Sequence, residues 1–148
     1  MPTTSIVLAS DHAGFEQKQQ LAAWLVQEGF EVRDLGPASD ARVDYPDYAA
    51  RVAREVASGA AERGVLVCGT GIGMAIAANK IPGVRAANIT SPQFAALARE
   101  HNDANVIALS GRFVSLETNK QILTSFLSTP FGEGRHADRV AKISALEQ

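Results

Sequence analysis

The sequence predicts an α/β fold, in which helices cover both faces of a five-stranded, mostly parallel β-sheet. Two observations carry this prediction. Five short apolar runs, each of a length typical of a buried strand, alternate with stretches of helical spacing or helix-forming residues. This alternation, which favours parallel strands, continues along the chain without an internal repeat or a low-complexity tract. With 148 residues, 46% of them hydrophobic, the chain suits one domain, residues 1–148.

The first half of the chain supplies two strand–helix pairs. The apolar run at 5–10 is typical of a buried strand, and Leu21 and Leu25 lie on the apolar face of the helical stretch that follows. Gly29 closes this helix, and the alternation after it indicates a second strand before Pro37. The predicted elements are a strand at 5–10, a helix at about 15–28, a strand at 30–35 and a helix at about 47–58.

A polar stretch joins the second strand to the second helix. It begins at Gly36 and runs through Asp40 and Asp44, which makes it long for a connection in an α/β protein. Long surface loops often carry functional residues. We therefore expect this loop to form a wall of a substrate site, with Tyr45 inside the loop.

The second half of the chain supplies three further strands. Good helix formers follow the apolar run at 65–67, and Pro92 suits the first turn of a helix capped by Ser91. The predicted elements are a strand at 65–67, a helix at 74–78, a strand at 83–89, a helix from 92 to about 99 or 100, a polar link at 101–105, a strand at 106–109, a helix at about 116–127, a glycine-bearing loop at 130–135 and a final helix at about 139–146.

The strand at 65–67 runs into a glycine-rich turn, Cys68-Gly-Thr-Gly-Ile-Gly73. Glycines that alternate with Thr70 and Ile72 permit positive φ angles and remove side-chain bulk, so backbone N–H groups can converge on an anion where the next helix begins. Cys68, the one cysteine of the chain, stands beside this cradle. The alternative is a packing turn in which Cys68 is a small buried residue.

Other motifs fit this stretch poorly. A dinucleotide fingerprint would need glycine where Met74 stands, and a P-loop would need a Gly-Lys-Ser/Thr ending. The histidines and Cys68 lack metal-ligand spacing, so we expect no metal and no cofactor. A cysteine hydrolase that uses Cys68, His101 and Asn102 is an alternative, although adjacent His and Asn residues reproduce the usual orienting geometry poorly.

Composition and charge narrow the class of partner. A formal net charge of −2 without a block of basic residues argues against nucleic-acid binding. No apolar run approaches the roughly 18 residues of a membrane span, and the start of the chain lacks a signal-peptide pattern. Because one cysteine cannot form an intrachain disulfide, a reducing, cytoplasmic location is the expectation.

Reactive and polar residues follow three of the predicted strands. Asp11 and His12 come after the first strand, Cys68 ends the third, and Arg112 follows the fifth. Because ligands of parallel sheets bind beyond the carboxyl ends of the strands, we expect these side chains to converge on a site. The alternatives are a helix-capping role for Asp11 and a hydrogen bond to nearby backbone for His12.

Two further groups occur in the second half of the chain. His101 follows a predicted helix, where the helix dipole favours a charged imidazole, so C-capping is the alternative to a chemical role. Arg135, His136 and Arg139 place two guanidinium groups around an imidazole within one helical turn. That spacing suits the binding of a phosphate. A solvated basic helix start is the alternative.

Five motifs occur in order along the chain. They are Ser10-Asp-His-Ala-Gly14, Asp44-Tyr-Pro46, Cys68-Gly-Thr-Gly-Ile-Gly-Met-Ala-Ile-Ala-Ala-Asn-Lys80, Arg99-Glu-His-Asn-Asp-Ala-Asn105 and Gly134-Arg-His-Ala-Asp-Arg139. In these motifs, and over nearly its whole length, the chain resembles the type B ribose-5-phosphate isomerases and the related galactose-6-phosphate isomerase subunits. The resemblance implies a Rossmann-like three-layer fold. It also implies a homodimer or a dimer of dimers, in which the neighbouring subunit completes each site.

The resemblance further implies the interconversion of ribose 5-phosphate and ribulose 5-phosphate through a cis-enediolate. Cys68 would be the base, Thr70 would assist it, and His101 would open the furanose ring. The tail from about residue 130 would contribute to the dimer and to the phosphate site. The implied substrate contacts are the backbone of Gly69, Gly71, Ile72 and Gly73 for the enediolate oxygen, Asp11, Tyr45 and Asn102 for hydroxyls, and His12, Arg112, Arg135, His136 and Arg139 for the phosphate.

The chemistry of the residues agrees with these implied roles. A carbon acid beside a carbonyl is hard to deprotonate, so the reaction needs a nearby base and a preorganised oxyanion site, and Cys68 lies beside both. Two alternatives stay open. One is the same reaction on a four- or six-carbon sugar phosphate, because the sequence does not measure the room between Cys68 and the phosphate group. The other is a non-catalytic protein that binds sugar phosphates.

Overall fold

Five strands form one parallel sheet at the centre of the protein, as the sequence predicts. The computed structural model describes residues 4–147, and within them the strands pair in the order β2-β1-β3-β5-β4, every pair parallel. The strands are β1 (Ser5–Ser10), β2 (Glu31–Asp34), β3 (Arg63–Cys68), β4 (Ala86–Asn88) and β5 (Val106–Ser110).

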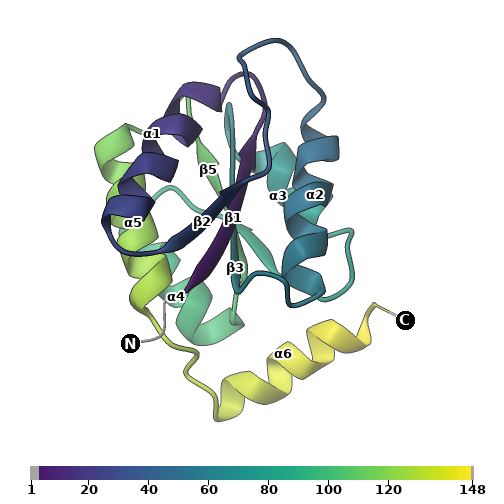
Figure 1. Ribbon diagram of the computed structural model, residues 1–148. Helices are drawn as coiled ribbons and strands as arrows, with labels where there is room; N and C mark the ends of the chain where they lie inside the picture. Colours follow the sequence, from purple (N-terminus) through teal and green to yellow (C-terminus); the bar gives the residue numbers. More distant parts are fainter. Residues whose placement is uncertain (1–3, 148) are drawn as a thin grey trace.

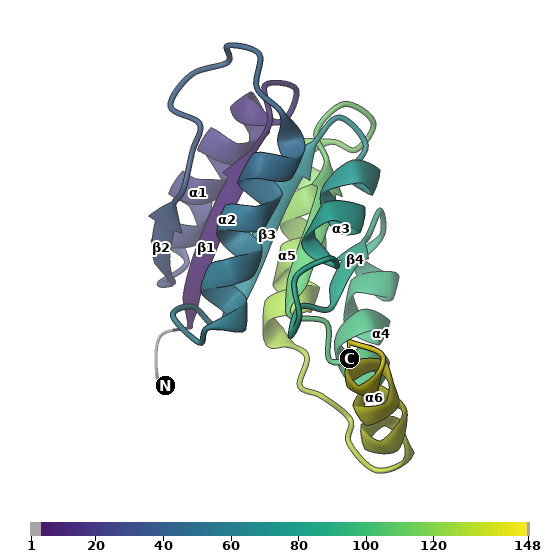
Figure 2. The same cartoon turned by 90° about the vertical axis from the view of Figure 1, so that its right-hand side faces the viewer.

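Helices cover both faces of this sheet (Figure 1). One face carries α1 (Phe15–Gln27), α4 (Pro92–Asn102) and α5 (Leu116–Ser128), and the other carries α2 (Tyr45–Ala57) and α3 (Ile72–Ala78). Figure 2 shows the same layers from the side of α2 and α3. The arrangement is the predicted Rossmann-like α/β/α sandwich.

The central strands are apolar on both faces because helices cover both. Ile6 and Leu8 of β1 point toward α1, α4 and α5, whereas Val7 and Ala9 point toward α2 and α3. All four side chains are at most 1% exposed. This double burial holds the carboxyl ends of β1, β3 and β5 rigidly at one edge of the sheet.

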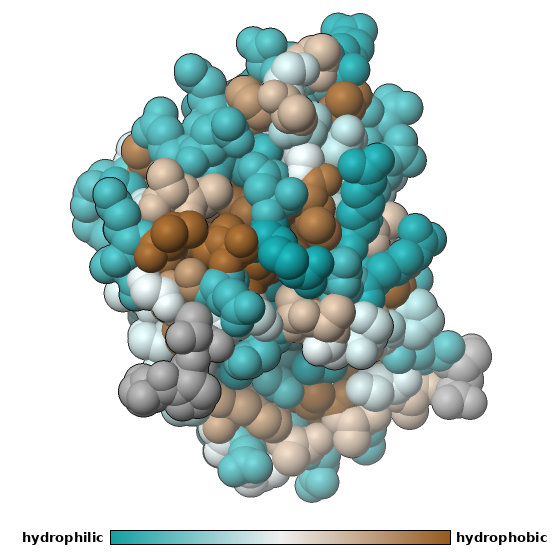
Figure 3. All heavy atoms as spheres, viewed as in Figure 1, coloured by the Kyte–Doolittle hydropathy of each residue, from teal (hydrophilic) through white to brown (hydrophobic). Residues whose placement is uncertain are grey.

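The last helix, α6 (Arg135–Ala145), lies outside the three layers, beside α4 (Figures 1 and 2). None of its residues is buried, and Ile143 is 42% exposed. Leu146, just beyond the helix, is 83% exposed. Hydrophobic residues are visible along this helix at the bottom of Figure 3, and they also gather left of centre, over α1 and β2. A helix with so little burial in its own chain is typical of a contact with another molecule.

The structure corrects the predicted start of α2. Tyr45 is the first residue of the helix and not part of the preceding loop, so the helix begins two residues before Asp47. Pro46 fits the first turn, where its missing N–H would have no partner in any case. Asp44, with extended backbone, is the N-cap residue. Tyr45 therefore has a helical backbone that holds it in place.

Boundaries in the second half differ as well. Helix α4 continues through His101 and Asn102, which the sequence placed in a polar link, and it ends where Asp103 adopts a φ of 50°. Helix α6 begins at Arg135 and not at about residue 139, directly after Gly134 with a φ of 58°. Strand β4 is shorter than the predicted 83–89, since Gly83 lies in a turn with a φ of 91°.

Candidate active site

The thiol of Cys68 ends β3 at the carboxyl edge of the sheet. The residue is 5% exposed, and its Sγ accepts a hydrogen bond from the backbone N–H of Gly71 at 3.0 Å. Gly71 has a φ of 87°, in the left-handed region that favours glycine, and it is the N-cap residue of α3. An N–H donor that points at sulfur stabilises a thiolate more than a thiol. The turn therefore places a backbone N–H donor against the sulfur of Cys68.

The glycines of the turn allow other groups to approach closely. A Cβ atom on Gly73 would lie 2.6 Å from Cε1 of Tyr45, and one on Gly69 would lie 3.4 Å from the Arg112 guanidinium. Ile72 is 54% exposed, and the hydroxyl of Thr70 accepts a hydrogen bond from the Ile72 N–H at 3.1 Å. The Thr70 hydroxyl can thus donate its own proton to a ligand oxygen.

Asp11 and His12 stand beside Cys68 at the end of β1. The Asp11 N–H donates to the carbonyl oxygen of Val67 at 3.2 Å, and Asp11 Oδ1 accepts from the Gly14 N–H at 2.9 Å. His12 Nδ1 accepts from the Val43 N–H at 3.3 Å. In the neutral imidazole the proton is then on Nε2, which is the nitrogen that can donate to an anion. His12 therefore has the backbone bond considered for it, whereas Asp11 does not cap α1, whose N-cap residue is Gly14 without a side-chain bond. Each of the two residues keeps a polar atom for a ligand.

The end of β5 is tied to the same turn. The carbonyl oxygen of Gly69 accepts from the Arg112 N–H at 3.1 Å and from the Ser110 hydroxyl at 2.7 Å. The Gly111 N–H donates to the Cys68 carbonyl oxygen at 2.8 Å. These bonds place the Arg112 guanidinium at the edge of the glycine turn, where it can meet a phosphate.

The second group of candidate residues lies at the opposite edge of the sheet. Helix α4 runs antiparallel to the strands, so its last turn, with His101 and Asn102, is at their amino ends (Figures 1 and 2). Asn105, just beyond, accepts a hydrogen bond from the N–H of Gly64 at 2.9 Å. Cys68 is four residues further along β3, about 13 Å at the usual rise of a strand.

The imidazole rings of His101 and His136 stack on each other at this edge. Their centroids are 4.4 Å apart, and the ring planes differ by 16°. The Gly132 N–H donates to the Glu100 carbonyl oxygen at 2.9 Å, which holds the start of the tail against α4. Partial loss of water, followed by repulsion from His101, Arg135 and Arg139, lowers the pKa of His136.

One chain therefore brings together only part of the predicted site. The first group meets at the carboxyl edge of the sheet, and the second meets at the amino edge. The carboxyl-edge group comprises Asp11, His12, Tyr45, Cys68, Gly69, Thr70, Gly71, Ile72, Gly73 and Arg112, and the amino-edge group comprises His101, Asn102, Arg135, His136 and Arg139.

The sequence reasoning missed two residues that support these groups. Asn88, at the end of β4, donates from Nδ2 to the Thr70 carbonyl oxygen at 3.2 Å. Arg99, which is 3% exposed, donates to Asp103 Oδ1 at 2.7 Å and to the Thr129 carbonyl oxygen at 3.2 Å. It thus ties the end of α4 to the start of the tail. The signal for Asn88 was its place as a polar residue at the end of a strand, whereas an arginine inside a helix gives no such signal.

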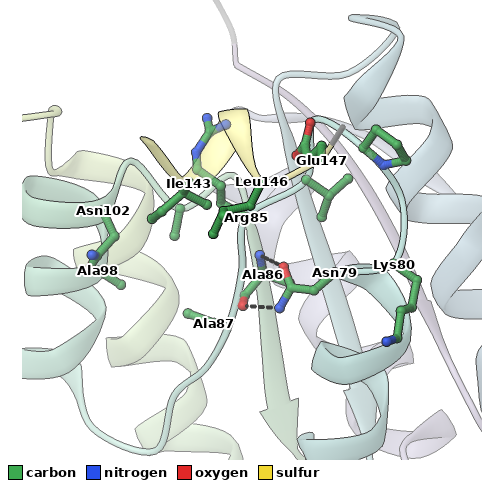
Figure 4. Close-up of a pocket in the computed structure, with 13 residues that line it drawn as sticks. Asn79, Lys80, Arg85, Ala86, Ala87, Ala98, Asn102, Ile143, Leu146 and Glu147 are labelled. Atoms are coloured by element: carbon green, nitrogen blue, oxygen red, sulfur yellow. Dashed lines mark hydrogen bonds between the residues drawn. The ribbon is translucent and has the colours of Figure 1, made fainter. Parts of the chain in front are cut away.

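A cavity of about 590 Å³ lies beside the amino-edge group (Figure 4). Asn102, Arg85 and Ala86 line it together with Ile143 and Leu146 at the end of the chain. Cys68 does not line this cavity, so it is not the space around the thiol. Within residues 4–147, no group of three or more His, Cys, Asp or Glu side chains is placed to hold a metal ion. No helix in that range is long and apolar enough to cross a membrane.

Comparison with known proteins identifies the family of this chain. A family model described as Ribose/Galactose Isomerase matches residues 6–143. The chain belongs to the ribose/galactose isomerase family. Ribose-5-phosphate isomerase B of Escherichia coli (strain K12), a relative, is 47% identical over 143 residues, which are 97% of this chain and 96% of the relative.

Solved structures of ribose/galactose isomerases have the same fold. The ribose-5-phosphate isomerase B of Clostridium thermocellum superimposes with a TM-score of 0.96 at 46% identity, covering 97% of both chains. The Mycoplasma genitalium enzyme with bound ribulose-5-phosphate gives a TM-score of 0.95 at 44% identity, covering 99% of this chain and 98% of that one. These findings confirm the family that the five motifs indicate and its Rossmann-like fold.

Proposed function

We propose that this protein interconverts ribose 5-phosphate and ribulose 5-phosphate, with Cys68 as the base and with each active site built from two chains. The hydrogen bond from the Gly71 N–H to Cys68 Sγ is the observation that carries the mechanism, because it favours a thiolate beside backbone donors. The ribose-5-phosphate isomerase B relatives and the family membership support the substrate.

The proton transfer uses the residues of the carboxyl edge. The Cys68 thiolate takes the proton from C2 of the open-chain aldose. The electrons of that bond form the C1–C2 double bond of a cis-enediolate, and the π electrons of the C1 carbonyl move onto O1. The Gly71 and Ile72 N–H groups already donate to Cys68 Sγ and to the Thr70 hydroxyl. Other backbone N–H groups of the turn hold the enediolate oxygen, and the Thr70 hydroxyl donates to a neighbouring oxygen. The hydroxyl proton on O2 passes to O1. The C2=O bond then forms as the proton on Cys68 returns to C1, which gives the ketose. Tyr45 and Asp11 orient the sugar hydroxyls.

Ring opening and phosphate binding use the residues of the amino edge. The imidazole of His101 moves a proton from the anomeric hydroxyl to the ring oxygen, because a ring nitrogen can accept a proton and donate it again. Asn102 binds a hydroxyl beside it. The residues that hold the phosphate are Arg135 and Arg139, with His12, Arg112 and His136 near them.

This division requires a second copy of the chain. Cys68 and His101 lie at opposite edges of the sheet, so neither chain alone offers both to one sugar. Helix α6 with its exposed Ile143, and the cavity beside it, give a partner a surface to cover. The assembly is a homodimer or a dimer of dimers, in which the tail from about residue 130 reaches the partner's Cys68. A free thiol used as a base also suits the reducing cytoplasm.

Proton NMR in deuterated water tests this function. Ribose 5-phosphate is incubated with the parent protein and, separately, with the Cys68→Ala variant, and conversion and deuterium incorporation at C2 are followed. We expect conversion and exchange with the parent only, while the variant still binds the sugar phosphate. Exchange that persists without the thiol would contradict the role of Cys68.

A six-carbon sugar phosphate is the second candidate substrate, since the family description also names a galactose isomerase. A panel of four-, five- and six-carbon aldose phosphates in the same NMR assay separates these substrates. If no member of the panel is converted but sugar phosphates bind, the protein is a non-catalytic sugar-phosphate-binding protein.

A further inference from the structure

The peptide group between Thr70 and Gly71 is held at both ends. Its N–H, on Gly71, donates to Cys68 Sγ at 3.0 Å. Its carbonyl oxygen, on Thr70, accepts from Asn88 Nδ2 at 3.2 Å. One planar group therefore connects the side chain of Asn88 to the thiol of Cys68, and a rotation of that plane would change both bonds together.

The amide of Asn88 is itself fixed. Nδ2 also donates to the carbonyl oxygen of Ala108 at 3.1 Å, on the neighbouring strand β5. Because both partners are carbonyl oxygens, the two N–H bonds of the amide face them and the orientation of the side chain is determined. Asn88 thus links the glycine turn to the backbone of a buried strand.

Gly71 makes this arrangement possible. A Cβ atom at this position would lie 2.3 Å from Asn88 Nδ2 and 3.0 Å from the Ala108 carbonyl oxygen. The φ of 87° at Gly71 also aims its N–H back toward the sulfur, in a conformation that other residues rarely adopt. Gly71 therefore both leaves room for the Asn88 side chain and directs its own N–H to the thiol.

We propose that Asn88 is a positioning residue that orients and polarises the Thr70–Gly71 peptide, so that its N–H stabilises the thiolate of Cys68. Hydrogen bonds in a chain strengthen one another. When the carbonyl oxygen of a peptide group accepts a bond, the N–H of the same peptide group becomes a better donor. The inference deepens the proposed function, because that function makes the thiolate the base. No atom of Asn88 needs to touch the substrate.

Other charged and titratable groups also face this edge of the sheet. Asp11 and His12 follow β1, Tyr45 begins α2, and Arg112 follows β5. The test therefore changes Asn88 and leaves all of these groups in place.

The experiment measures the thiolate directly. Cys68 is the one cysteine of the chain, so the ultraviolet absorbance of the thiolate, taken at each pH as the difference from the Cys68→Ala variant to remove the signal of the two tyrosines, reports on this residue alone. In Asn88→Ala we expect the absorbance profile to move to higher pH and the thiolate fraction at neutral pH to fall about threefold to tenfold. The kcat should fall, while KM for ribose 5-phosphate changes little.

Asn79, the C-cap residue of α3, supplies a matched control because its side chain also bonds to β4. Its side chain donates to the Ala86 carbonyl oxygen at 2.9 Å and accepts from the Ala86 N–H at 2.8 Å, as the dashed lines in Figure 4 show. Asn79→Ala therefore also removes two bonds to backbone near β4, but none to the Thr70–Gly71 peptide. We expect it to leave the thiolate profile unchanged. Asn88→Gln, which keeps an amide donor, should recover part of the parent profile.

Three outcomes would overturn the proposal. They are an unchanged profile in Asn88→Ala, an equal shift in Asn79→Ala, and a shift in Asn88→Gln as large as in Asn88→Ala. Circular dichroism shows whether each variant is folded, and Asn88→Gln supplies the test if Asn88→Ala is not. The absorbance profile does not depend on any substrate. A protein that converts no sugar phosphate can thus still confirm the role of Asn88, and failure of the two proposals can be told apart.

Discussion

The imidazole of His101, in the last turn of α4, stacks on the imidazole of His136, in the first turn of α6, with a centroid distance of 4.4 Å. The contact connects the residue proposed for ring opening to the segment proposed for phosphate binding. Two imidazoles this close repel each other when both are protonated. The stack therefore resists double protonation as the pH falls.

The lowered pKa of His136 predicts how this residue responds to a fall in pH. Loss of water, and then the charges of His101, Arg135 and Arg139, keep His136 neutral to a lower pH than an ordinary histidine. As the pH falls below about 6.5, the unfolded chain binds this proton more readily than the folded chain, so His136 then favours unfolding. NMR titration of the ring protons should show a depressed midpoint for His136.

The His101→Phe variant tests the contribution of His101 to this shift, which comes after the loss of water. It keeps a flat ring for stacking but removes the charge, so the midpoint of His136 should rise toward its ordinary value. His12 lies at the other edge of the sheet and is the internal control, because its titration should not change. A midpoint of His136 that stays where it was would show that His101 does not cause the shift.

Complementation tests the two-chain site. Cys68→Ala and His101→Asn should each be nearly inactive on ribose 5-phosphate, because each removes one half of every site. Coexpression should restore roughly a quarter of the parent turnover, since half of the dimers are mixed and each mixed dimer has one intact site. Turnover by a monomer, measured with light scattering, would rule out the shared site.

Because Lys18 is buried, we expect its substitution to have a large effect on the free energy of unfolding. Its ammonium group is fully buried and donates to both oxygens of Asp34, at 2.9 and 2.8 Å, and to the Pro37 carbonyl oxygen at 2.9 Å. Lys18→Met removes all of these bonds, and Asp34 then keeps only the bond from the Gly36 N–H, so we expect a loss of about 2–4 kcal/mol in the free energy of unfolding. Urea denaturation measures it. Lys80→Met, at an exposed position, should stay within about 0.5 kcal/mol of the parent.

We expect a side chain at position 14 to clash with the strand that carries the thiol. A Cβ atom there would lie 2.4 Å from the carbonyl oxygen of Val67, which belongs to the central strand β3 and cannot move freely. We expect Gly14→Ala to lower the free energy of unfolding by about 1–3 kcal/mol and to reduce turnover, since Val67 also binds the Asp11 N–H. At Gly29 a Cβ would meet nothing within 4 Å. Gly29→Asn, compatible with its positive φ, is the control.

Local patterns in the sequence were sufficient for much of the fold and for half of the site. The apolar runs predicted all five strands, because a parallel sheet covered on both faces needs strands that are apolar on both sides. The turn from Cys68 to Gly73 was found because its residues are adjacent in the chain. Asp11, His12 and Arg112 were found because each comes directly after a strand, and the carboxyl ends of parallel strands meet at one edge.

Boundaries were less predictable where one residue type suits two structures. Pro46 suits a loop as well as the first turn of a helix, so Tyr45 was assigned to the wrong element. His101 and Asn102 are polar enough for a link, and tertiary contacts of Arg99 with Asp103 and Thr129 stabilise the last turn of α4 instead. Such contacts join residues that are far apart in the sequence or depend on burial.

The sequence by itself determined the order of strands and helices, the glycine turn beside Cys68, and the set of residues that resembles an isomerase site. Only the tertiary structure decided that His101 lies at the opposite edge of the sheet from Cys68 and that Asn88 reaches the Thr70–Gly71 peptide. The physical reason is that periodicity and turn chemistry are properties of neighbouring residues. The relative placement of two side chains depends instead on how the whole chain packs into layers.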